Sequence, residues 1–130
     1  MKTPSLILVI LLLFACKVGD SLENGTPIIE ANAVIYNNNL PVDGCAEHIS
    51  LVNEKGEFLK NYLPTEATRQ IFSKLLDAEA AKLPNGQYSG NLQIPVVLKY
   101  RESQQKAELV CGWNKKSTVE QIEIVSITKK

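Results

Sequence analysis

The sequence predicts a mainly β domain in which five or six short strands form a small barrel or curled sheet, with one helix among them. Short segments of β-branched and apolar residues recur along the chain, which is the pattern of strands. One segment, residues 65–82, instead carries apolar residues at helical spacing. The length of 130 residues fits one domain, and a hydrophobic content of 45% is enough for a packed core.

Three strands are expected before the helix. Residues 28–36 are rich in β-branched and apolar side chains. A second strand is expected at residues 45–52 and a third at residues 57–62. The polar tetrapeptide 53–56, which ends in Gly56, predicts a turn that joins them.

The strongest strand signal follows the helix. Residues 92–101 alternate with a period of two, which predicts a strand with one buried face. The polar residues 103–105 predict a turn into another strand at residues 107–113. A last strand is expected at residues 122–127, where the adjacent apolar pair Ile124 and Val125 indicates a bulge or burial of both faces.

The helix is expected to begin at Thr65 as its N-cap and to place one apolar stripe against an open end of the sheet. Alternatively, the stripe binds a partner helix. The element order β-β-β-α-β-β predicts an OB-like barrel with the helix between strands three and four. The alternative is a curled antiparallel sheet with the same elements.

The N-terminus carries an export signal. Lys2 precedes an apolar run at residues 6–14, which is too short to cross a bilayer as a helix and fits a signal peptide. The sequence Leu13-Phe14-Ala15-Cys16 resembles the lipobox of bacterial lipoproteins. The resemblance implies cleavage before Cys16, a thioether-linked diacylglycerol on its sulfur and an acyl chain such as palmitate on its amine. The alternatives are an ordinary cleaved signal with Cys16 as a thiol, or a retained anchor.

These signals divide the chain into a signal peptide (1–15), an anchor with a polar tether (16–27) and a β domain (28–130). Two or more acyl chains on Cys16 hold a protein stably at a membrane. Lys17 stands where some bacteria carry the Asp that retains lipoproteins in the inner membrane, so the outer membrane is favoured. We therefore expect a lipid-anchored protein of the cell envelope.

The other two cysteines, Cys45 and Cys111, form an even pair in an exported chain, which predicts one disulfide. The alternative is two buried free thiols. Trp113 follows two residues later and is expected to pack in the core against this disulfide. If Trp113 instead lies at the end of its strand, it is a partly exposed aromatic residue and a candidate contact for a ligand or partner.

Four short elements carry a second resemblance. Gly44-Cys45, Val97-Leu98-Lys99-Tyr100, the terminal Ile-Glu-Ile-x-x-Ile at residues 122–127 and above all Cys111-Gly112-Trp113 are similar to elements of small exported β proteins of Bacteroidota. No activity is assigned to those proteins. The resemblance therefore implies a fold and a compartment, without a function.

Charge and composition argue against several function classes. The 14 basic and 14 acidic residues balance, so no nucleic-acid partner is expected. His48 is the only histidine, and the adjacent Glu47 would point to the opposite face of a strand, so a catalytic pair is not expected. One His and two paired Cys do not make a metal site, and we expect neither a metal nor another cofactor.

The leading hypothesis is a membrane-anchored, non-enzymatic module that binds a protein or glycan of the envelope or serves as an accessory subunit. The alternative is an inhibitor of a hydrolase such as lysozyme, for which the turn at residues 53–57 is the candidate loop. A small enzyme that uses converging carboxylates is a third class, with no local pattern of acidic residues to support it.

Overall fold

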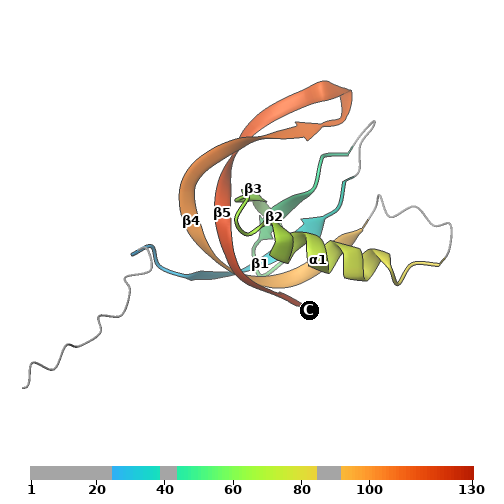
Figure 1. Ribbon diagram of the computed structural model, residues 1–130, viewed down its shortest axis with the longest axis horizontal. Helices are drawn as coiled ribbons and strands as arrows, with labels where there is room; N and C mark the ends of the chain where they lie inside the picture. Colours follow the sequence, from blue (N-terminus) through green and yellow to red (C-terminus); the bar gives the residue numbers. More distant parts are fainter. Residues whose placement is uncertain (1–24, 39–43, 85–91) are drawn as a thin grey trace, which may run out of the picture.

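The computed structural model describes residues 25–38, 44–84 and 92–130, and the expected signal peptide and Cys16 lie outside these ranges (Figure 1). Five strands form a closed barrel in the order β1-β2-β3-β5-β4. The elements are β1 (Ile29–Tyr36), β2 (His48–Val52), β3 (Phe58–Pro64), α1 (Arg69–Ala80), β4 (Gln93–Cys111), the 3-10 turn η2 (Gly112–Asn114) and β5 (Lys115–Lys129).

The pairing of the strands confirms the OB-like prediction. β1 pairs antiparallel with both β2 and β4, and β4 pairs antiparallel with β5. β3 and β5 run parallel, and this pair closes the barrel. The alternative of a curled, wholly antiparallel sheet is therefore wrong. α1 lies between β3 and β4 in the chain, as expected.

The turn expected at residues 103–105 is wrong, because β4 continues through this segment as one strand of 19 residues. The pairing with β5 is interrupted between Glu102 and Lys106, and Gln104 has a positive φ of 59°. The Ser103 hydroxyl donates to the Gln121 carbonyl at 2.7 Å and accepts the Gln105 amide at 3.2 Å. These side-chain bonds hold the irregular segment against β5, so the polar run makes a bulge and two expected strands are one.

A second bulge lies where Ile124 and Val125 are adjacent. Lys99 pairs with Ser126 and Tyr100 pairs with Ile124, so Val125 is the extra residue. Ile124 is buried, whereas Val125 is 40% exposed. This confirms the bulge that the sequence predicted.

The helix begins later than expected. α1 starts at Arg69, with Thr68 rather than Thr65 at the capping position. The Thr65 carbonyl nevertheless accepts the amides of Thr68 and Arg69, so a turn of helix-like backbone precedes α1. The Thr68 hydroxyl accepts the Ile124 amide at 3.1 Å and the Thr65 amide donates to the Ile122 carbonyl at 2.9 Å. The start of the helix is thus bonded to β5, next to its bulge.

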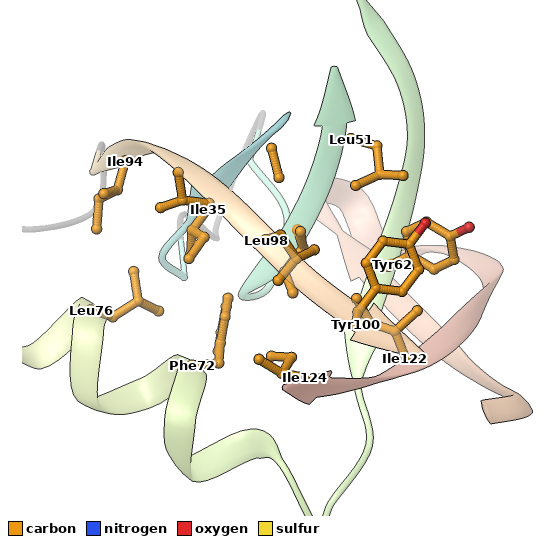
Figure 2. Packing of buried hydrophobic residues seen from close by; sticks show 13 residues of the cluster. Ile35, Leu51, Tyr62, Phe72, Leu76, Ile94, Leu98, Tyr100, Ile122 and Ile124 are labelled. Carbon is orange, nitrogen blue, oxygen red and sulfur yellow. The ribbon is translucent and has the colours of Figure 1, made fainter. Parts of the chain in front are cut away.

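The apolar stripe of α1 covers the barrel interior, as the sequence predicted. Phe72 and Leu76 are buried and point from α1 toward the barrel residues, whereas Ile71 on the same helix is 40% exposed (Figure 2). Burial of one such side chain stabilises the fold by about 1.5–3 kcal/mol. The core cluster contains Ala33, Ile35, Ile49, Leu51, Tyr62, Phe72, Leu76, Ile94, Val96, Leu98, Tyr100, Ile122 and Ile124.

Candidate binding site at the disulfide clasp

A disulfide ties the connection between β1 and β2 to the end of β4. Cys45 and Cys111 are bonded, which confirms the predicted pair. Two backbone bonds flank them, because the Gly112 amide donates to the Gly44 carbonyl at 2.7 Å and the Ala46 amide donates to the Val110 carbonyl at 2.8 Å. We call residues 44–46 and 110–112, with their disulfide, the disulfide clasp. In OB-like barrels these two connections commonly form the binding surface.

The turn after the clasp joins β4 to β5. The Lys115 amide donates to the Gly112 carbonyl, and both central residues have positive φ, 60° at Trp113 and 53° at Asn114. This is the backbone of a type I′ hairpin turn, which favours Asn and Gly. Asn114 suits its position. A bulky residue at φ 60° is rare, and holding one there costs on the order of 1–3 kcal/mol.

Trp113 is 78% exposed, so the expectation that it packs in the core is wrong. The residue occupies a central position of the turn rather than a strand position. It therefore does not share a face of β4 with Cys111, and its indole projects beyond the clasp. The alternative reading, an exposed aromatic residue at a strand end, is the one that the structure supports.

The surroundings of Trp113 are polar. The next five residues along the chain are all exposed and hydrophilic, and the Lys116 ammonium lies 3.2 Å from the Glu108 carboxylate. Among the described residues, the other large apolar side chains that are exposed belong to other segments. These are Ile28, Phe58, Leu59, Ile71 and Val125.

His48 packs beside the clasp. Its ring stacks on Tyr36, with centroids 4.7 Å apart and planes 3° from parallel. Nδ1 donates to the Ala46 carbonyl at 2.8 Å, next to the bonded Cys45. Burial lowers the pKa of His48, and the bond to Ala46 opposes this shift. The ring is therefore a neutral packing element that positions residue 46. The adjacent Glu47 makes no bond to His48 that would orient it, within the residues that the structure describes.

Several of the acidic groups form ion pairs with lysines. Glu120 contacts Lys60, Glu79 contacts both Lys82 and Lys129, and Glu30 lies 3.2 Å from Lys99. The hydrogen bonds from these lysines lower the pKa values of Glu120 and Glu79. In the described ranges, no three His, Cys, Asp or Glu residues gather as ligands for a metal ion.

A second surface lies between β3 and β5, and the sequence analysis missed it. The two strands pair only at residues 62–64 and 120–122. Before that point they enclose a hollow of about 400 Å³, lined by residues 58–61, residues 118–120 and Lys106. Phe58 and Leu59 are 63% and 58% exposed beside it. The sequence signal for this surface was the pair of adjacent apolar residues, Phe58 and Leu59, near the start of an expected strand.

One buried tyrosine of the core, Tyr100, has a shifted pKa. Burial, followed by interactions with Tyr62, raises the pKa of Tyr100 to about 12, so this phenol stays protonated at neutral pH.

None of the helices described is long and apolar enough to cross a membrane. The chain matches no protein-family model, and no curated protein or solved structure matches it.

Proposed function

We propose that this protein is a lipid-anchored, non-enzymatic binding module of the bacterial envelope, with Trp113 at the centre of its contact surface. One observation carries the binding role. Trp113 is 78% exposed at φ 60°, at the tip of a hairpin that a disulfide holds. Strained backbone persists where the surrounding structure enforces it, and it concentrates at functional sites.

The clasp makes this display rigid. A disulfide and two backbone hydrogen bonds hold the strand end from which the turn begins. A rigid aromatic side chain loses little conformational entropy when it binds, so more of the contact energy appears as affinity. Tryptophan is also among the residues that most often dominate binding interfaces. The side chain of Trp113 is exposed, its backbone is strained and the clasp holds the strand end before it. Together these features favour a role of Trp113 in binding.

The position of the hairpin suits a protein anchored at Cys16. Gly25 and Thr26 line a hollow with residues 102–104, so the described chain begins beside the base of the hairpin. β4 then runs seven residues from Gln104 to Cys111, about 20–25 Å of strand. The start of β1 and the turn between β4 and β5 lie on opposite sides of the barrel (Figure 1). An anchor at the N-terminal side would leave Trp113 facing away from the membrane, which we take to be the outer membrane.

Crosslinking in intact cells of the native source tests this function. We expect the wild-type protein to capture a dominant envelope partner and Trp113→Ala to lose it. Ile71→Ala is the matched control, because Ile71 is also an exposed large apolar residue but lies on α1. Equal capture by wild type and Trp113→Ala would contradict the role of Trp113. The mass of the recovered protein tests the anchor, because an unmodified Cys16 would contradict lipidation.

Inhibition of a hydrolase is a second candidate, favoured by the rigidity of the turn between β2 and β3. The Asn53 carboxamide oxygen accepts the amides of Lys55 and Glu57, both at 2.9 Å, and its nitrogen donates to the Glu57 carboxylate at 2.6 Å. Inhibitors present such preorganised loops to enzyme clefts. Lysozyme activity that is unchanged by an excess of the protein would exclude this function for lysozyme.

A further inference from the structure

We infer that the ligand of Trp113 is an acidic glycan, and this inference rests on the proposed binding function of the same residue. In this arrangement the indole stacks on a sugar ring while the polar residues that follow it bind hydroxyl and carboxylate groups. Three features of the turn support a glycan ligand: the polar residues that follow Trp113, the positive charge of Lys115 and the narrow shape of the hairpin.

The first support is that, in the part of the chain that the structure describes, the residues that follow Trp113 at the tip are polar. Residues 114–118 are exposed and carry an amide, two ammonium groups and two hydroxyls. A protein interface surrounds its dominant aromatic residue with further packed contacts that exclude water. A sugar presents a flat C–H face and a rim of hydroxyl groups, which match one aromatic ring among hydrogen-bonding side chains. OB-like barrels bind oligosaccharides through these same connections.

The second support is the charge of the tip. Residues 110–118 contain Lys115 and Lys116 and no acidic residue. Glu108, on the paired strand, contacts Lys116 at 3.2 Å and offsets one of these charges. Glu47 lies farther back, beside Ala46 of the clasp. Lys115 makes no ion pair with a described residue, so it leaves one positive charge close to the indole, although the whole chain is neutral. An anionic polymer gains from this charge, and a neutral glycan does not.

The third support is shape. Trp113 protrudes from a narrow two-stranded hairpin and is 78% exposed. The apolar surface that would suit a protein partner lies elsewhere, at Phe58 and Leu59 beside the hollow between β3 and β5. A narrow tip with one aromatic ring can contact a single glycan strand from the side. A glycan layer beyond the membrane is also within reach of a tip that faces away from the anchor.

Because Trp113 is the only tryptophan of the chain, its fluorescence reports directly on the site. The experiment adds soluble peptidoglycan fragments, which carry carboxylates, to the purified full chain in detergent. We expect a saturable blue shift of the emission and at least a two-fold reduction of acrylamide quenching. Neutral chito-oligosaccharides should bind at least about 10-fold more weakly, and Lys115→Gln should narrow this difference. Unchanged emission and quenching with the peptidoglycan fragments would overturn the inference.

Sedimentation with insoluble peptidoglycan gives a second readout. We expect Trp113→Ala to lose sedimentation and Trp113→Phe to retain part of it, whereas Ile71→Ala should behave as wild type. Equal sedimentation of Trp113→Ala would overturn the glycan inference. If crosslinking captures a protein through Trp113 while peptidoglycan leaves the fluorescence unchanged, the glycan inference is wrong and the binding function stands. If Trp113→Ala changes neither crosslinking nor sedimentation, both the glycan inference and the binding function are wrong.

Discussion

Cys111 and Trp113 are two residues apart, yet the first is bonded to Cys45 and the second is 78% exposed. The disulfide fixes the end of β4, and the backbone then enters a turn that turns the indole away from the barrel. The disulfide-bonded Cys111 and the exposed Trp113, whose backbone is strained, thus lie close together in the chain. This relationship links stability and binding at one end of the hairpin.

Replacement of Trp113 by Asn should stabilise the fold while it abolishes binding. Asn tolerates positive φ far better than Trp, so we expect the free energy of unfolding to rise by about 1 kcal/mol. Urea unfolding followed by circular dichroism measures this. Asn114→Gly is the control, because Asn114 already suits its φ of 53° and should change stability less. A clear loss of stability in Trp113→Asn would show that the indole contributes packing.

Removal of the disulfide should destabilise the protein and leave Trp113 exposed. The double variant Cys45→Ala, Cys111→Ala loses the closure of a long loop, which the chain-entropy model values at about 4 kcal/mol. The indole should remain accessible to acrylamide under native conditions, because the turn itself sets its exposure. A stability loss below about 1 kcal/mol in urea unfolding would show that the two flanking backbone bonds suffice.

Stability should fall in mild acid because of His48. Burial lowers the pKa of this residue in the folded protein below its ordinary value of 6.5. The unfolded chain therefore takes up a proton first, and stability is lost as the pH falls from about 6.5 through the lowered pKa. We expect His48→Phe, which can keep the stacking on Tyr36, to remove the pH dependence of urea unfolding in this window. The carboxylates Glu79 and Glu120, whose pKa values are also lowered, act only below their ordinary pKa of 4.5. An unchanged profile in His48→Phe would contradict this assignment.

Thr68 should matter through its hydroxyl. Its oxygen accepts the Ile124 amide beside the bulge, and Thr68→Val keeps the shape but leaves this amide without its partner. An unsatisfied buried donor costs about 1–3 kcal/mol. Thr68→Ser retains the acceptor and should lose clearly less stability. Thermal unfolding of the two variants provides the comparison, and a loss in Thr68→Ser as large as the loss in Thr68→Val would contradict the dominant role of the hydroxyl.

Several elements of the fold could be predicted because their signals are local. The period of two in β4, the stripe of α1 and the adjacent Ile124 and Val125 each depend on neighbouring residues alone. The element order then restricted the topology to few candidates. The pairing of the two cysteines followed from their number and from the expectation of export. Lipidation of Cys16 and the envelope location stay predictions of the sequence.

Errors arose where a distant segment decides the outcome. Residues 103–105 were expected to turn, but Ser103 bonds to Gln121 across the sheet and keeps β4 continuous. The helix start moved from Thr65 to Thr68 because both residues are engaged by β5. The hollow beside Phe58 exists because β3 and β5 pair only at residues 62–64 and 120–122 and lie apart before these residues. None of these partners is near in sequence.

The sequence by itself determined the fold class of this protein: a mainly β domain with one helix and one disulfide. Periodicity and residue type suffice for this, because the spacing of apolar residues along the chain indicates which faces of a strand or helix are buried. Only the tertiary structure decided the surface. The position of Trp113 depends on a turn whose backbone is held by residues 44–46, almost 70 positions away in the chain. The exposure of a side chain depends on the assembled barrel. A single aromatic residue in a sequence does not show whether its side chain lies in the core or on the surface.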